Sequence, residues 1–199
     1  VNVWVKHENH TPIGAFKVRG GLVYMDRLRR EKPDARGAIA ATRGNHGQSI
    51  AFAARASGIH AVIVVPEGNS TEKNDAMRAF GAELLVHGHD FQAALEYAEG
   101  QAVERNLEMV PSFAVELAHG IATYGMELFT AAPDLDTLYV PIGLGSGLTG
   151  CVTAREALGL KTEIVGVVSE NAPAYALSFA KGEAVSTNSA GTFADGLAC

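Results

Sequence analysis

The chain has 199 residues, 47% of them apolar and 19% charged, enough to bury the core of one domain or two small ones, which argues against disorder. A formal net charge of -6 without long basic runs argues against a nucleic-acid partner. No apolar stretch reaches the roughly 18 residues that span a bilayer, and the N-terminus has no signal-peptide pattern, so we expect a cytoplasmic protein with no membrane partner.

Apolar runs of four or five residues alternate with longer amphipathic stretches, which is typical of βα units around a mostly parallel sheet. The expected strands cover residues 1–5, 38–41, 61–65, 83–86, 107–110, 138–140 and 164–168. The expected helices cover residues 16–30, 47–57, 71–80, 91–106, 115–128, 147–158 and 172–181. The sequence therefore predicts an α/β fold. Because it starts inside a strand-like run without an initiating Met, we expect the chain to be a fragment of a longer protein.

In open α/β sheets, ligands bind beyond the carboxyl ends of the strands, so turns from strand to helix are the candidate sites. One such turn is "PIGLGSGLTG", residues 141–150, where Gly143, Gly145 and Gly147 let the backbone approach a ligand at a helix N-terminus. This arrangement suits a phosphate, although a tight strand-to-helix connection without a ligand explains the same glycines. The turn lacks the Gly-Lys-Ser/Thr ending of a nucleotide triphosphate loop, and the acid of a dinucleotide-binding motif is also missing.

A second turn, "ATRGNHGQSIAFAA", residues 41–54, gathers hydrogen-bond donors from Thr42, Asn45 and His46 at the start of a helix. Donors at a helix N-terminus suit a carboxylate; a helix cap without any ligand is the other interpretation.

The third segment contains Lys17, in "FKVRGG". A lysine beside Phe16 and near a helix start can have its pKa lowered by desolvation, as an amine nucleophile requires. An ordinary solvated helix lysine is the alternative.

In order and content, these segments resemble the fold type II pyridoxal-phosphate-dependent enzymes, specifically the threonine/serine ammonia-lyase (dehydratase) and serine racemase group. The matching segments are "KHENHTPIGAFKVRGG", "TRGNHGQSIAFAA", "PIGLGSGLTG" and "GTFADGLA". The resemblance implies a two-lobed architecture of mostly parallel sheets flanked by helices. Residues 1–36 and 114–199 would belong to a large cofactor domain, and residues 37–113 to a small mobile domain. It also implies a homo-oligomer, either a dimer or a tetramer.

The resemblance implies pyridoxal 5'-phosphate as cofactor and a role for each segment. Lys17 would form a Schiff base with it, Phe16 would lie against its pyridine ring, and Asn45 would bond the ring hydroxyl oxygen. The substrate carboxylate would bind to the loop of Thr42, Arg43, Gly44, Asn45 and His46. The phosphate would bind to the loop of Gly143, Leu144, Gly145, Ser146 and Gly147.

Two departures from the family pattern bear on specificity. Leu144 and Ser146 replace residues that are commonly glycine, and Ser146 can offer its hydroxyl to the phosphate. Arg43 stands where racemase relatives carry a serine, which argues against two-base racemisation. It either favours a substrate with a second carboxylate, such as a 3-hydroxyaspartate, or turns to solvent.

No metal site is expected. Relatives with a divalent-cation site carry acids where this chain has Val168 and Ala174, and Glu170 has no assigned role. His87 and His89, in "VHGHD", are interpreted as part of a polar loop. Cys151 and Cys199 lack metal spacing and are expected to be reduced thiols.

The function expected from the resemblance is elimination of the β-hydroxyl of L-threonine, L-serine or a related hydroxy amino acid, giving a 2-oxo acid and ammonia. The alternatives within the fold are a β-replacement enzyme or an amino-acid racemase. From another class, a non-catalytic phosphate- or anion-binding α/β domain stays open, as does a purely structural interaction domain.

Overall fold

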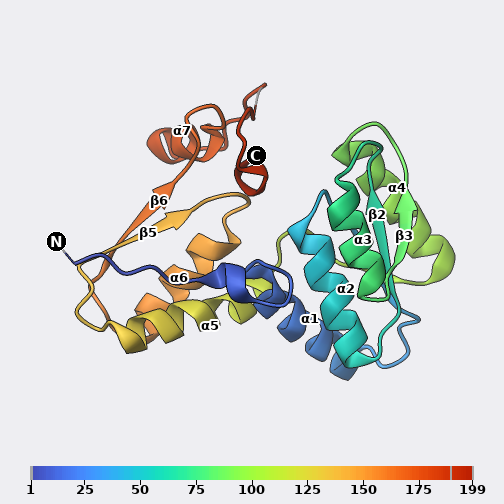
Figure 1. Cartoon of the computed structure of the whole chain (residues 1–199), viewed down its shortest axis with the longest axis horizontal. Coiled ribbons are helices and arrows are strands. Elements are labelled where there is room, and N and C mark those ends of the chain that lie inside the picture. Colours follow the sequence, from blue (N-terminus) through green and yellow to red (C-terminus); the bar gives the residue numbers. More distant parts are fainter. Residues whose placement is uncertain (1, 189, 199) are drawn as a thin grey trace. The chain divides into compact units, whose positions relative to one another are not determined.

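The computed structural model describes residues 2–188 and 190–198 (Figure 1). The chain divides into two compact units, Val1–Gly120 and Ile121–Cys199, and the boundary falls inside helix α5 (Val115–Ala131). All strand pairs in the described residues are parallel, and helices flank them, so the predicted α/β class is confirmed. The division at residues 36/37 and 113/114 stays a prediction.

The first unit is built on a four-stranded parallel sheet with the order β3-β2-β1-β4. The strands are β1 (Ala38–Ala41), β2 (Ala61–Val65), β3 (Glu83–Val86) and β4 (Glu108–Met109). In this sheet Ala38 pairs with both Ala61 and Glu108. Every residue of β1 and β2 is buried, as expected for central strands of a parallel sheet that is covered on both faces.

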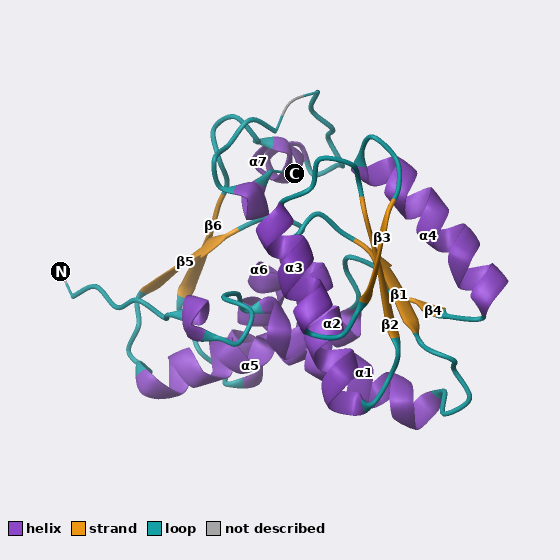
Figure 2. Cartoon of the chain, turned by 45° about the vertical axis from the view of Figure 1, so that its right-hand side comes forward, coloured by secondary structure: helices purple, strands orange, loops and turns teal. Residues whose placement is uncertain are grey.

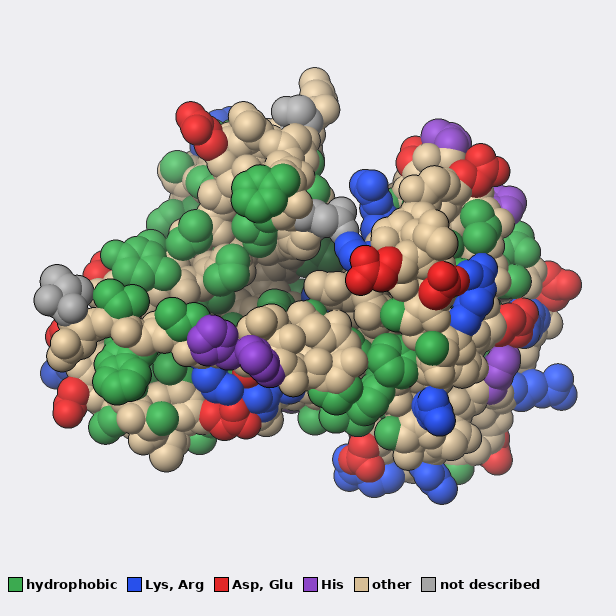
Figure 3. All heavy atoms as spheres, in the orientation of Figure 1, with side chains coloured by type: hydrophobic (Ala, Val, Ile, Leu, Met, Phe, Trp, Pro, Cys, Tyr) green, Lys and Arg blue, Asp and Glu red, His purple; other side chains and the backbone are tan. Residues whose placement is uncertain are grey.

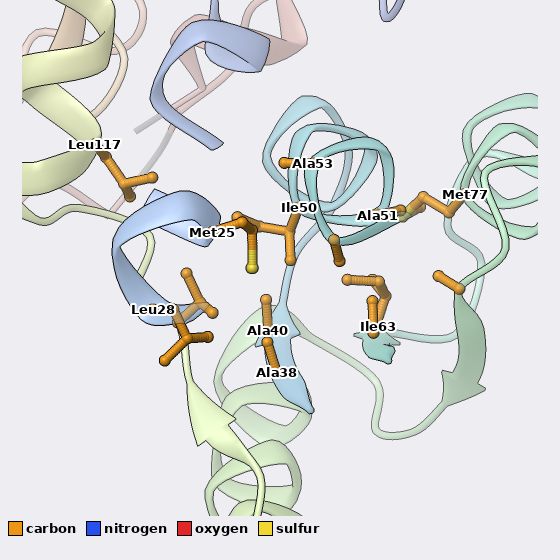
Figure 4. Close-up of a cluster of buried hydrophobic side chains, with 14 of the residues drawn as sticks. Met25, Leu28, Ala38, Ala40, Ile50, Ala51, Ala53, Ile63, Met77 and Leu117 are labelled. Carbon is orange, nitrogen blue, oxygen red and sulfur yellow. The ribbon is translucent and has the colours of Figure 1, made fainter. Parts of the chain in front are cut away.

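Helices cover both faces of this sheet (Figure 2). They are α1 (Lys17–Glu31), α2 (Asn45–Ser57), α3 (Thr71–Ala79) and α4 (Phe91–Arg105). Alternate side chains of β1 point to opposite faces: Ala38 and Ala40 belong to the core with α1, α2 and α3, whereas Ile39 and Ala41 pack against α4. Figure 4 shows Met25 and Ile50 meeting over Ala40 in the first of these cores.

The second unit contains the later part of α5 and a parallel pair of strands, β5 (Thr137–Pro141) and β6 (Glu163–Val167), in which Thr137 pairs with Glu163. Helix α6 (Ser146–Ala157) connects these strands, and α7 (Ala174–Lys181) follows β6. This strand-helix-strand order places the predicted glycine loop directly at the carboxyl end of β5. Two short 3-10 helices, Glu8–His10 and Asp195–Leu197, complete the described elements.

The predicted elements match the described ones within about three residues at each end, with one exception. The strand expected at residues 1–5 is wrong, because residues 2–5, the described part, form no strand. A strand needs a neighbouring strand to bond its backbone groups, and an apolar run cannot supply one. Val3, Trp4 and Val5 are instead 80%, 71% and 68% exposed.

Charged side chains of both signs are mixed on the face shown in Figure 3. This mixture fits the modest negative net charge. Among the described helices, none combines the length and the apolar character that a bilayer crossing requires. Cys151 is buried and forms no disulfide within the described residues, whereas Cys199 lies outside them.

Candidate active site

The loop of residues 42–46 lies at the carboxyl end of β1, where α2 begins at Asn45. The buried Thr42 oxygen accepts hydrogen bonds from the backbone amides of Gly44 and Gly47, at 3.0 and 3.2 Å. Thr42 therefore holds the loop in shape from inside, in the way that a capping side chain satisfies the first amides of a helix.

Gly47 allows α2 to start close to the sheet. A Cβ atom at this position would lie 2.6 Å from the sulfur of Met77 and 3.0 Å from Cγ2 of Ile63, and it would also meet the methyl group of Thr42. These distances are shorter than van der Waals contact, so the loop that carries Thr42 packs this closely only with glycine at position 47.

His46 is a buried side chain in the first turn of α2, only 8% exposed. Burial, and secondarily the positive charge of Lys17, lower its pKa to about 3, although a backbone hydrogen bond with Val110 opposes the shift. Within the described structure, its Nε2 atom is buried and has no hydrogen-bond partner. His46 is therefore a neutral imidazole at physiological pH, with a nitrogen left to bond another group.

The low pKa of His46 predicts a pH effect on stability. The pKa falls from 6.5 in the unfolded chain to about 3 in the folded one, so the unfolded state takes up the proton first. The resulting stability is present above pH 6.5 and is lost as the pH falls toward 3, by up to about 1.4 kcal/mol per pH unit. We expect His46→Gln to flatten the dependence of the unfolding free energy on pH between 6.5 and 5, measured by urea unfolding. Parallel profiles for the wild type and the variant would contradict the assignment.

Two cationic residues lie at the loop of residues 42–46: Arg43, which is part of it, and Lys73 of α3. Arg43 is exposed, as its solvent-facing interpretation requires. Lys73 of α3 lies over Gly44, with its Nζ atom 2.9 Å from where a Cβ of Gly44 would be. Both would favour an anion near the loop. Lys73 was missed by the sequence analysis because α3 reaches the loop only through tertiary packing.

Lys17 is the first residue of α1, and its Nζ atom lies 5.6 Å from the centroid of the Phe16 ring. The Ser49 hydroxyl of α2 donates a 2.6 Å hydrogen bond to the Lys17 backbone carbonyl. Ser49 comes one helical turn after Asn45, so the first unit brings Lys17 and the Asn45 loop together on adjacent helices. Ser49 was also missed, because its partner is a backbone atom that no sequence pattern identifies.

In the glycine loop of the second unit, Gly145 is the N-cap residue of α6 and has the left-handed conformation, with a φ of 87°. Glycine adopts this conformation without strain. No side chain caps this helix start in the described structure, and its first turn contains no acid. Its amide groups therefore offer a phosphate the donors and the positive dipole end that anions prefer.

The other residues of the glycine loop differ in burial and in their contacts. Ser146 and Gly147 are buried, and the Tyr124 hydroxyl of α5 donates a 3.1 Å hydrogen bond to the Gly147 carbonyl. Leu144 is 42% exposed. The backbone at the start of α6 is thus held from behind by Tyr124, while the Leu144 side chain faces outward.

Three features together are typical of one class of protein. They are a primary amine at the start of α1, a loop rich in hydrogen-bond donors at the start of α2, and a glycine turn at the start of α6. The chain matches the family described as pyridoxal-phosphate dependent enzyme over residues 1–199, and it belongs to that family. The predicted resemblance is therefore confirmed.

The chain is also similar to several individual proteins. The chain is 35% identical over 198 residues, 99% of its length, to the L-threonine dehydratase biosynthetic IlvA of Haemophilus influenzae, and it spans 38% of that protein. The structure of processed threonine deaminase isoform 2 from Solanum lycopersicum matches with a TM-score of 0.93 and 32% identity, covering 100% of this chain and 58% of that one. Maize serine racemase matches with a TM-score of 0.92 and 27% identity, covering 98% and 59%.

The donors present fit the cofactor that gives the family its name. Taken by itself, the first unit carries a primary amine, Lys17, that suits its aldehyde, and the second unit carries the uncapped start of α6, which suits its phosphate. The role of Asn45 stays a prediction. No group of three or more His, Cys, Asp or Glu side chains suitable for a metal ion occurs within residues 2–188 and 190–198. The expectation of no metal stays a prediction.

Proposed function

We propose that this chain belongs to a pyridoxal-phosphate-dependent ammonia-lyase that eliminates the β-hydroxyl of L-threonine, L-serine or a related hydroxy amino acid. One observation carries the proposal: the Ser49 hydroxyl donates a 2.6 Å hydrogen bond to the Lys17 carbonyl, which fixes the Lys17 backbone against α2, the helix that begins in the loop that suits a substrate carboxylate. The names of the dehydratase and deaminase relatives support this reaction.

When bound, pyridoxal phosphate supplies an electron sink for the negative charge that develops on the substrate Cα. In the proposal, the amine of Lys17 removes the Cα proton, and the loop of residues 42–46 orients the substrate through its carboxylate. Asn45 orients the cofactor ring oxygen, and the residues Gly143 to Gly147 hold the phosphate. The β-hydroxyl leaves as water with a proton that balances the one Lys17 removes from Cα, and addition of a second water later gives the 2-oxo acid and ammonia.

Within the fold, amino-acid racemisation and β-replacement are the alternatives. The likeness to maize serine racemase favours racemisation. Against racemisation, Arg43 stands where racemase relatives carry a serine. Against β-replacement, the "TRGNHG" loop differs from the loop of β-replacement relatives. A non-catalytic anion-binding domain would need no Lys17. Cytoplasmic location, self-association and the absence of nucleic-acid and membrane partners stay predictions.

The test uses the full-length parent protein with pyridoxal phosphate and three substrates: L-threonine, L-serine and 3-hydroxyaspartate. We expect 2-oxo acid and ammonia in equal amounts, measured by chromatography and an ammonia assay. Accumulation of D-serine without oxo acid would support the racemase instead. A higher rate with 3-hydroxyaspartate than with threonine would support the role of Arg43 in binding a second carboxylate. No product from any substrate would overturn the lyase.

Asn45→Ala tests the assignment of the ring-oxygen donor. We expect kcat to fall by about tenfold to a hundredfold, because a misoriented ring slows the reaction, while cofactor retention changes little because the phosphate carries most of the binding. Gln92→Ala, which removes an exposed amide of α4, is the control and should leave both quantities unchanged. Unchanged kcat in Asn45→Ala would remove Asn45 from the site.

A further inference from the structure

The start of α1 differs from an ordinary helix N-terminus. Its N-cap residue is Phe16, whose side chain cannot accept hydrogen bonds from the first amides of the helix. The first helical residue is Lys17, whose side chain must move if it is to react. The backbone at this point therefore depends on contacts from other residues for its position.

An ion pair fastens the helix just after Lys17. Nε of Arg19 donates to one carboxylate oxygen of Glu8 at 2.8 Å, and its Nη2 donates to the other at 3.0 Å. Lys6 adds a third bond to Glu8 at 2.9 Å. The side chains of Glu8 and Arg19 are only 13% and 21% exposed. Burial raises the pKa of Glu8, but the bonds from Arg19 and Lys6 outweigh that effect and lower it, so the carboxylate stays ionised.

A second contact fastens the chain just before Lys17. The Thr11 hydroxyl donates to the Ala15 carbonyl at 2.8 Å, and the same oxygen accepts a bond from the Ala15 amide at 2.9 Å. With the bond from Ser49 to the Lys17 carbonyl, this makes three contacts within the five residues from Ala15 to Arg19. The tie between Glu8 and Arg19 is the charged one of the three, and its two-point geometry restricts orientation most strongly.

We propose that Glu8 and Arg19 are positioning residues for Lys17. The two hydrogen bonds of their ion pair fix the backbone at the start of α1, and the position of that backbone determines where the lysine amine lies. The inference rests on the proposed function, because it concerns the same lysine. Arg19 and Lys17 are two positions apart and lie on different sides of the helix, so the guanidinium acts through the backbone.

Lysine in place of arginine keeps the charge but cannot form the two-point bond, so Arg19→Lys separates geometry from charge. Glu8→Gln keeps the shape and removes the charge, and the double variant Glu8→Gln with Arg19→Lys completes the comparison. The control is Arg105→Lys, because Arg105 and Glu83 form the same two-point pair, at 2.9 and 2.6 Å, away from Lys17. All variants are made in the full-length protein.

The first readout is the rate at which borohydride traps pyridoxal phosphate on the Lys17 peptide, followed by mass spectrometry. The second readout is steady-state kinetics, which shows whether each variant changes kcat or KM. In Arg19→Lys and Glu8→Gln we expect the trapping rate and kcat to fall about tenfold to a hundredfold with KM nearly unchanged, and Arg105→Lys to match the wild type. The double variant should lose no more than the worse single variant, because both residues serve one interaction.

The outcomes separate this inference from the proposed function. If the wild type takes up no cofactor at Lys17, the proposed function fails. If the wild type is labelled at Lys17 but Arg19→Lys and Glu8→Gln are trapped at its rate, the positioning role is overturned and the proposed function stands. Equal losses in Arg19→Lys and Arg105→Lys would also overturn it, since a general effect of losing an ion pair would then explain both.

Discussion

Replacing Lys17 with alanine is expected to lower turnover on the order of a thousandfold or more, because in the proposed mechanism Lys17 supplies both the amine that binds the cofactor and the base for the Cα proton. Lys17 lies at the first position of α1, with its carbonyl bonded to Ser49, so a methyl side chain is tolerated there without disturbing the helix. We expect borohydride reduction with pyridoxal phosphate to label the Lys17 peptide of the wild type and to leave the variant unlabelled.

Lys32→Ala is the matched control, because Lys32 caps the other end of the same helix and forms a surface ion pair with Glu108 at 2.7 Å. An exposed pair of this kind contributes about 0–1 kcal/mol, so activity and labelling should persist. Label on a different lysine, or full turnover in Lys17→Ala, would refute the assignment and favour an anion-binding domain.

Gly47→Ala is expected to lower the free energy of unfolding by about 1–3 kcal/mol, because the added methyl group meets Met77, Ile63 and Thr42 in a packed core. The same contact displaces Thr42, whose oxygen shapes the loop of residues 42–46. We therefore expect a loss of stability, measured by urea unfolding, together with a fall in kcat of about tenfold or more.

Gly100→Ala is the control for this substitution. Gly100 is also a helical glycine of the first unit, but a Cβ there would meet nothing within 4 Å. Alanine should stabilise α4 by about 0.5–1 kcal/mol through its higher helix propensity, and it should leave turnover unchanged. If Gly47→Ala behaves like Gly100→Ala, the close packing at the start of α2 does not constrain the loop.

The segment from Ala38 to Val65 shows why most of the fold could be predicted from the sequence. Its two apolar runs and the intervening amphipathic stretch give β1, α2 and β2, and both strands have the expected bounds. Local hydrophobic periodicity is enough for such elements, because their burial follows directly from the pattern. Residues 2–5 mark the limit: they have the composition of a strand, but strand formation depends on a neighbouring strand as well.

The sequence by itself determined the family, through the order of the lysine, the "TRGNHG" loop and the glycine turn, and it determined which helix each one begins. These are properties of short contiguous segments, whose residue types and spacing are visible in the chain. Only the tertiary structure decided that Ser49 holds the Lys17 backbone, that Arg19 pairs with Glu8, and that burial keeps His46 neutral. Such contacts depend on which elements pack together and how closely, because distances and burial arise only when separate segments fold onto one another.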